Sequence, residues 1–206
     1  MNDSKLVELA GMVSAWPGLV ARPDPGLIDD CLVLLDHLGD ARRVVDVGSG
    51  GGLPGLPLKI VRPELELTLI EADQDKAAFL VHACARLGIE RVEVLARRAE
   101  DAGHDPRLRE SFDVAVARAL APLPVLAELC LGLVRVGGRL LAQKTESEGT
   151  GNGERAIEIM GGTLVAVHAA PSGARRSGTV VVIEKTRPTP DGYPRRPGIP
   201  NRKPLR

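Results

Sequence analysis

The chain has 206 residues with 27 basic and 27 acidic side chains, so it is long enough for one domain with a core and has no basic field over its whole surface. One tryptophan, one tyrosine and two phenylalanines are too few for the base-stacking platforms of RRM or OB domains. Three cysteines, far apart among apolar residues, indicate buried helix positions and predict neither disulfides nor a metal site.

Two amphipathic helices are predicted ahead of the sheet, at residues 4–14 and about 26–38, because apolar residues recur there at helical spacing. The proline-rich stretch WPGLVARPDPG (16–26) between them predicts a loop. The chain begins without a secretory signal, and no run approaches eighteen apolar residues, so we expect a cytoplasmic protein with no membrane contact. Residues 1–40 are interpreted as an N-terminal helical extension.

From residue 43 onward, β-branched runs alternate with helical stretches. Strands are predicted at 43–47, 67–72, 92–96, 112–117, 139–144, 163–168 and 179–185, and helices at 55–61, 74–87, 106–110, 123–134 and 153–160. This alternation predicts an α/β, Rossmann-like sheet that is mostly parallel, over a core of residues 41–186. The linker AAPSGARRSG is too short for a crossover helix, so the last two of the seven strands should pair as an antiparallel edge hairpin.

The stretch VVDVGSGGGLPGLPL (44–58) joins the first strand to a helix for which Pro54 suits the first position. Glycines there allow positive φ and close approach of a ligand to backbone N–H groups. Glu71 ends the second strand, where an acid can hold both hydroxyls of a ribose. Asp46, two residues before the first glycine, and a reversed seventh strand are typical of class I S-adenosylmethionine-dependent methyltransferases. The predicted cofactor site includes Asp46, Gly48, Ser49, Gly50, Gly52, Leu53 and Glu71.

Residues at the strand ends bear on the methyl acceptor. The segment ARALAP (117–122) lacks the tetrad of exocyclic-amine methyltransferases, no cysteine ends a strand, and no histidine has a carboxylate at a spacing that would make it a base. Arg118 and Lys144 follow the fourth and fifth strands, where such sheets place their clefts. Two cations without a base suit an acceptor that loses no proton, such as guanine N7. Alternatively, Arg118 pairs with Asp46, Glu71 or Glu100 and orders the cofactor pocket.

Residues 26–205 resemble the bacterial small-subunit ribosomal RNA guanine-N7 methyltransferases, the glucose-inhibited division protein B family. The glycine segment, RRAED (97–101), the run from 112 to 133 and YPRRPGIPNRKPL (193–205) carry the resemblance. The resemblance implies methylation of one guanine of 16S rRNA near the decoding centre with S-adenosyl-L-methionine. It assigns Gly48, Leu53, Ala99, Glu100 and Arg118 to the cofactor site, and we assign Lys144 to positioning of the RNA.

Three places in the chain, with four residues, depart from the family pattern. The second strand ends in Glu71-Ala72 where the family has Asp-Ser, and Asp75 precedes Lys76 where the family has a Lys-Arg pair. Leu27 stands where the family often has a histidine. These changes leave the cofactor prediction intact and bear on RNA docking at the N-terminal side.

The last segment, residues 187–206, is a proline-rich basic tail that we expect to lie along the core. Its predicted RNA-binding residues are Arg195, Arg196, Arg202 and Lys203, with Arg175 and Arg176 at the hairpin tip as an extension. The alternative is a solvated terminus. If the tail binds RNA, its removal should weaken RNA affinity and spare cofactor binding.

Two other functions fit the residues. A divergent methyltransferase would act on another RNA or a small molecule, without dependence on the tail. A non-catalytic RNA-binding assembly factor would keep the fold with a dead site, which the joint presence of Asp46, Gly48, Glu100, Arg118 and Lys144 disfavours. We expect a monomer. The residues leave open whether naked rRNA, the small subunit or an assembly intermediate is the substrate.

Overall fold

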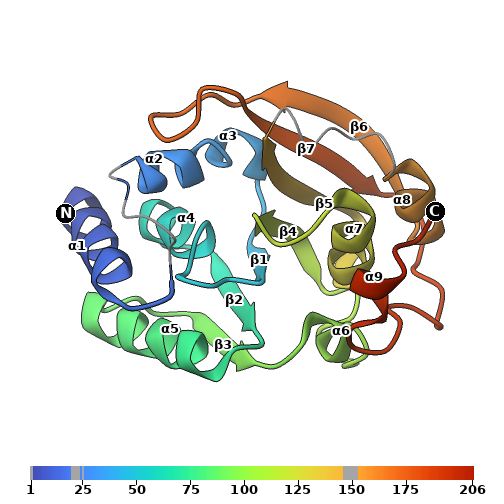
Figure 1. The fold of residues 1–206 in the computed structure, drawn as a ribbon, viewed down its shortest axis with the longest axis horizontal. Helices are drawn as coiled ribbons and strands as arrows, with labels where there is room; N and C mark the ends of the chain where they lie inside the picture. Colours follow the sequence, from blue (N-terminus) through green and yellow to red (C-terminus); the bar gives the residue numbers. More distant parts are fainter. Residues whose placement is uncertain (1, 20–23, 25, 146–152) are drawn as a thin grey trace.

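A computed structural model describes residues 2–19, 24, 26–145 and 153–206. Its strands form one sheet in the order β3-β2-β1-β4-β5-β7-β6 (Figure 1). The strands are β1 (Arg43–Val47), β2 (Glu66–Glu71), β3 (Val92–Ala96), β4 (Phe112–Arg118), β5 (Val134–Thr145), β6 (Gly162–Ala169) and β7 (Gly178–Lys185). In this described sheet β7 alone runs against its neighbours, β5 and β6, so the predicted topology with a reversed strand is confirmed.

Helices cover both faces of the sheet: α1–α5 lie on one side and α6–α9 on the other (Figure 1). They are α1 (Asn2–Ala15), α2 (Leu27–Leu32), α3 (Leu35–Leu38), α4 (Gly55–Val61), α5 (Gln74–Leu87), α6 (Ala99–Ala102), α7 (Leu123–Leu131), α8 (Glu154–Ile159) and α9 (Ile199–Arg202). Within the described helices, none is long and apolar enough to cross a bilayer.

Two helix predictions were wrong. The helix expected at 26–38 is divided into α2 and α3, because Leu34 N–H bonds to Cys31 O, three residues back, and the α-helical ladder is interrupted there. Residues 106–110 form turns, and the short helix of this connection is α6. Leu108 and Arg109 N–H both bond to Asp105 O, and the segment ends at Glu110 with a φ of +48°.

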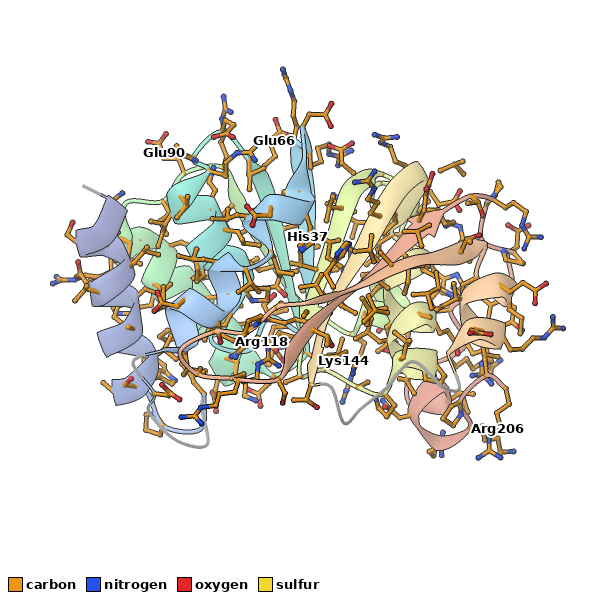
Figure 2. All side chains as sticks on the ribbon, turned by 90° about the horizontal axis from the view of Figure 1, so that it is seen from above. His37, Glu66, Glu90, Arg118, Lys144 and Arg206 are labelled. Carbon is orange, nitrogen blue, oxygen red and sulfur yellow. The ribbon has the colours of Figure 1, made fainter. Side chains whose placement is uncertain are left out.

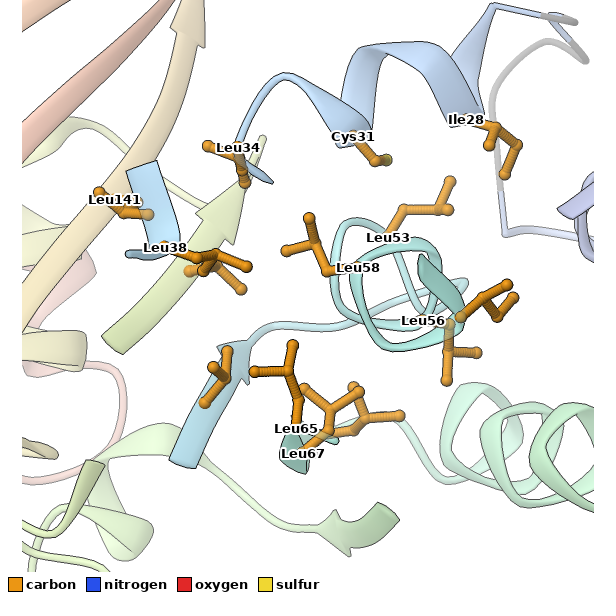
Figure 3. Packing of buried hydrophobic residues seen from close by; sticks show 14 of the residues in the cluster. Ile28, Cys31, Leu34, Leu38, Leu53, Leu56, Leu58, Leu65, Leu67 and Leu141 are labelled. Atoms are coloured by element: carbon orange, nitrogen blue, oxygen red, sulfur yellow. The ribbon is translucent and has the colours of Figure 1, made fainter. Parts of the chain in front are cut away.

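The core has two layers because neighbouring strand residues point to opposite faces. Val44, Leu67 and Val114 belong to the layer under α1–α5, whereas Val45, Ile70 and Ala115 belong to the layer under α6–α8. Burial on both faces explains why the strands read as apolar runs in the sequence. Figure 3 shows the first layer, in which Cys31, Leu34 and Leu38 of the N-terminal helices face Leu58 of α4. The N-terminal helices therefore share the core of the sheet domain.

The carboxyl ends of the parallel strands mark the edge of the sheet at which a binding site is expected. Glu66, at the start of β2, lies at the end opposite Arg118, the last residue of β4, and Lys144, the residue before the end of β5 (Figure 2). The parallel strands thus bring their carboxyl ends to one edge, where sheets of this type bind ligands.

Candidate functional site

A cleft of about 370 Å³ opens at the carboxyl ends of β1, β2 and β4. Its walls bring together eight of the residues predicted from sequence. These are Gly48, Ser49, Gly50, Leu53, Glu71, Ala99, Glu100 and Arg118. The cleft therefore collects the glycine loop, the acid of the second strand and the Ala-Glu pair after the third strand.

The glycine loop has the backbone that its sequence predicts. Gly48 and Gly50 have φ of 72° and 53°, and a Cβ on Gly48 would lie 2.4 Å from a methyl of Leu120. Glu71 Oε2 accepts the N–H of Gly50 at 2.8 Å, and its Oε1 accepts the N–H of Asp73 at 2.9 Å. Each carboxylate oxygen has a further lone pair. Glu71 therefore shapes the loop and still has acceptor sites that face the cleft.

These features fit S-adenosylmethionine. The cleft combines a backbone without side chains at Gly48 and Gly50, a carboxylate for ribose hydroxyls at Glu71, and an apolar wall at Leu53 and Leu129. The bound group would lie across the glycine loop, with Glu71 and Glu100 as its acids.

Asp46 lies beneath the loop, outside the lining of the cleft. The side chain is fully buried, and its Oδ2 accepts the N–H of Gly55 at 2.9 Å, while Oδ1 has no hydrogen-bond partner among the described residues. Burial raises the pKa of Asp46 to about 7, against the lowering effects of the Gly55 N–H and the charge of Arg118. Asp46 therefore fixes the turn from β1 into α4. It does not line the cleft in which the methyl donor was predicted to bind.

Gly52 also lies outside the lining. A Cβ there would be 2.4 Å from a methyl of Leu56, and its φ is +80°. The glycine is thus required by its positive φ and by the close approach of the Leu56 and Leu80 side chains. The helix begins at Gly55, in agreement with the predicted range 55–61. Pro54 is therefore its N-cap residue, whereas it was expected at the first helical position.

Arg118 pairs with an acid that the sequence analysis did not consider. Its Nη1 lies 3.3 Å from Asp30 Oδ2, whereas the expected partners were Asp46, Glu71 and Glu100. Asp30 is on α2 and its side chain is 1% exposed. It also accepts from Arg175 Nε at 3.0 Å and from Ser172 Oγ at 2.8 Å. One buried carboxylate thus joins α2, the end of β4 and the tip of the β6–β7 hairpin.

Lys144 is buried and does not line the cleft. Its ammonium donates to the carbonyl of Ala121, in the loop between β4 and α7. That loop begins with Ala119, at a φ of +52°, and it contributes Leu120 to the cleft wall. Lys144 therefore contacts the loop that carries part of the wall.

Cations that the sequence analysis did not select complete the rim. Lys76, Arg97 and Arg98 line the cleft with Arg118. Arg97 Nη2 pairs with Asp105 Oδ2 at 2.8 Å, and its buried Nε has no partner. The signal was present, since Arg97 and Arg98 open the RRAED motif that carried part of the resemblance.

The tail is held on the core by core side chains. Arg109 donates to the carbonyls of Tyr193 and Thr189, both at 2.8 Å, and His104 Nε2 lies 2.6 Å from Pro194 O. Arg195 forms a two-pronged pair with the buried Glu128, at 2.8 and 2.6 Å. The predicted RNA-binding residues therefore divide into Arg195, whose charge is paired, and Arg196, Arg202 and Lys203, which are exposed.

The cysteines lie on helices, where burial raises the pKa of Cys31 to about 12 and that of Cys84 to about 11. Cys31 and Cys130 are buried as predicted, and Cys84 is partly exposed. A thiol with so high a pKa is a poor nucleophile at neutral pH. None of the three lines the described cleft.

The family model described as "rRNA small subunit methyltransferase G" (GidB) matches residues 25–176. A ribosomal RNA small subunit methyltransferase G from Moorella thermoacetica is 46% identical over 186 residues, which cover 87% of this chain and 76% of that protein. The protein of the same name from Pelotomaculum thermopropionicum is 47% identical over 174 residues, covering 82% of this chain and 72% of the relative.

Solved structures show the same fold at low identity. The O-methyltransferase TomG from Streptomyces achromogenes, in complex with SAM, has a TM-score of 0.61 and 21% identity, covering 90% of this chain and 91% of that one. A 16S rRNA N2 methyltransferase from T. thermophilus, in complex with AdoMet and guanosine, has a TM-score of 0.55 and 18% identity, covering 81% and 40%. These likenesses support the class I methyltransferase fold alone.

Proposed function

The chain belongs to the rRNA small subunit methyltransferase G family, and from this membership we propose that it methylates N7 of one guanine of 16S rRNA near the decoding centre. The methyl donor is S-adenosyl-L-methionine, as the family and the fold require. The chain is therefore an rRNA methyltransferase, and the proposal concerns which base it modifies and how.

The character of the cleft wall carries the proposal. Among the described residues that line the cleft there is no histidine, cysteine, tyrosine or aspartate. Its two acids, Glu71 and Glu100, each accept backbone N–H bonds, and its remaining charged groups are cations. A wall with cations, whose two acids are assigned to the methyl donor, suits an acceptor atom that has a free lone pair and loses no proton, and guanine N7 is such an atom.

The residues of the chain would position the two reactants. Gly48, Gly50 and Glu71 would hold the donor, with Leu53 and the Ala99-Glu100 pair along its length. When bound, S-adenosylmethionine supplies an electrophilic methyl group, and its in-line transfer to N7 leaves S-adenosylhomocysteine and a positively charged guanine, with no proton to remove. Arg118, which is paired with Asp30 and lines the cleft, would donate to O6 of the guanine or to a phosphate.

The exposed cations Arg196, Arg202 and Lys203 support contact with the RNA backbone. Lys144 would act through the loop that it contacts, as a positioning residue. We also propose that the enzyme acts as a cytoplasmic monomer, since its substrate is part of the bacterial ribosome and the described lining of the cleft comes from one chain.

The experiment is incubation with S-adenosylmethionine labelled in its methyl group and small subunits, intact or deproteinised, from a strain without the endogenous enzyme. Borohydride and aniline treatment then cleaves the RNA at 7-methylguanine. We expect one labelled guanine near the decoding centre, and no incorporation into subunits from the parent strain. Label on another atom or another base would contradict the proposal. The better of the two substrates will show whether naked RNA or the subunit is recognised.

A further inference from the structure

The C-terminal helix α9 reaches the wall of the cofactor cleft. Asn201 lines the cleft together with Glu100 and Leu129. Gly198, the residue that caps α9, has a φ of +80° and donates its N–H to Glu100 Oε1 at 2.9 Å. Glu100 is buried, with 5% of its surface exposed. The tail is thus bonded directly to an acid of the cofactor site.

Both flanks of this wall are anchored. Arg195 is tied to Glu128 through its side chain and also through its backbone N–H, which donates to Oε1 at 2.9 Å. Arg195 Nη2 donates in turn to the carbonyl of Lys203 at 2.8 Å, which closes the segment around α9. The side chain of Asn201 is therefore presented to the cleft by a turn that both flanks hold in place.

The same turn carries the exposed cations of the tail. Arg202 and Lys203 follow Asn201 directly and are exposed, and Arg196 precedes Gly198 by two residues. A phosphate that binds these cations would restrain the turn from which Asn201 lines the cleft. An asparagine amide has two donors and an acceptor, which match the polar edge of a purine.

We infer that α9 completes the S-adenosylmethionine site, that Asn201 contacts the cofactor, and that RNA bound to Arg202 and Lys203 raises cofactor affinity through this turn. The coupling rests on the proposed function, whereas the cofactor contact does not. The structure therefore changes the expectation that removal of the tail spares cofactor binding, because Asn201 lines the cleft and Gly198 bonds to Glu100. By linkage, the cofactor must raise RNA affinity by the same factor.

The test is calorimetric binding of S-adenosylhomocysteine, which cannot react, to the full chain with and without unmethylated 16S rRNA. Asn201→Ala should weaken binding in the absence of RNA by about tenfold, the loss of one or two good hydrogen bonds. Arg206→Ala, an exposed cation of the same tail outside the cleft, is the matched control and should bind as the unaltered chain does. Thermal unfolding should be unchanged in both variants, because both side chains are exposed.

RNA should raise the affinity of the unaltered chain several-fold, and Asn201→Ala should remove that gain. The single change Lys203→Ala should weaken RNA binding and leave cofactor binding without RNA unchanged. Arg202 is kept because its Nε donates to the carbonyl of Gly198 at 3.3 Å and so supports the turn. Equal cofactor affinity of Asn201→Ala and the unaltered chain would overturn the contact, even if rRNA is methylated normally. Equal affinity with and without RNA would overturn the coupling. If the chain labels no rRNA and Asn201→Ala still binds the cofactor weakly, the proposed acceptor fails and the role of Asn201 in the site stands.

Discussion

Two buried carboxylates hold the two sides of the site, and they do so in opposite ways. Asp30 belongs to the N-terminal helix α2 and receives cations from the core strand β4 and the β6–β7 hairpin. Glu128 belongs to the core helix α7 and receives one cation from the tail, Arg195. In the first case the appended segment brings the acid, and in the second it brings the cation.

The geometry of the two pairs differs with their roles. Glu128 takes two side-chain N–H groups of Arg195 and its backbone N–H, at 2.6–2.9 Å, so its oxygens fix one piece of backbone. Asp30 takes a single, longer bond of 3.3 Å from Arg118, whose side chain still lines the cleft. Glu128 therefore anchors the chain, whereas Asp30 orients a cation whose side chain still lines the cleft.

The largest expected effect is on stability, from Glu128→Ala. Breaking a buried pair leaves Arg195 without its partner, and we expect a loss of about 3–5 kcal/mol in the free energy of unfolding, measured in urea. Glu158→Ala, which breaks the exposed pair with Arg155, is the control and should change it by less than about 1 kcal/mol. An equally small loss for Glu128→Ala would remove the distinction between an anchoring and an orienting acid.

Arg118→Ala should act on catalysis. We expect kcat/KM for the RNA to fall by about 10²–10³-fold, the usual cost of removing a donor from a reacting site. Arg135→Ala is the control, since Arg135 forms an ion pair with Asp113 and does not line the cleft. Turnover near that of the unaltered enzyme would show that Arg118 only orders the pocket.

Asp30→Asn sharpens the comparison because it removes the charge and keeps the shape. Arg118 and Arg175 would then repel each other, and we expect kcat to fall about tenfold with little change in cofactor affinity. Asp29→Asn, on the exposed side of the same helix, should have no effect. A merely structural role would instead lower the unfolding temperature and leave kcat intact at temperatures well below it.

The smallest expected effect is a pH dependence of stability that comes from Asp46. This buried acid, unlike Asp30 and Glu128, forms no ion pair with the described residues. Its folded-state pKa, raised to about 7 by burial, lies above the unfolded value near 3.8, so the folded state binds more protons between these values. The contribution of Asp46 to the free energy of unfolding is therefore fully present below pH 3.8 and is lost as the pH rises toward 7. Between about pH 5 and pH 6 the loss should be about 1 kcal/mol. Urea unfolding of Asp46→Asn should lack this decline, and an identical pH profile would show that Asp46 ionises normally.

Residues close in sequence made the cofactor site predictable. The glycine loop lies within one strand–turn–helix unit, and Glu71 ends the next strand, so their meeting follows from parallel pairing alone. Arg118 was predictable for the same reason. The helix boundary at 26–38 was not, because the break between α2 and α3 depends on local turns that apolar spacing does not report.

The partners of these residues lie far away along the chain. Asp30 and Arg175 are 145 residues apart, and Glu100 meets Gly198 across 98 residues. Charge and spacing in the sequence predicted three acids as partners of Arg118, whereas in the structure it pairs with a fourth, Asp30. No local pattern predicted that Asn201 lines the cleft. Its position there depends on the tail, which Glu128 anchors through Arg195.

Local sequence patterns were enough to predict the α/β sheet with its reversed strand, the glycine loop, the methyl-donor class and the family. These follow from strand periodicity, turn chemistry and local motifs, which act over a few residues. The packing of distant segments places Asp46 and Lys144 behind the cleft, pairs Asp30 with Arg118, and brings Asn201 of the basic tail to the cleft wall. Burial and ion pairing between distant segments are properties of the packed chain, and no local pattern encodes them.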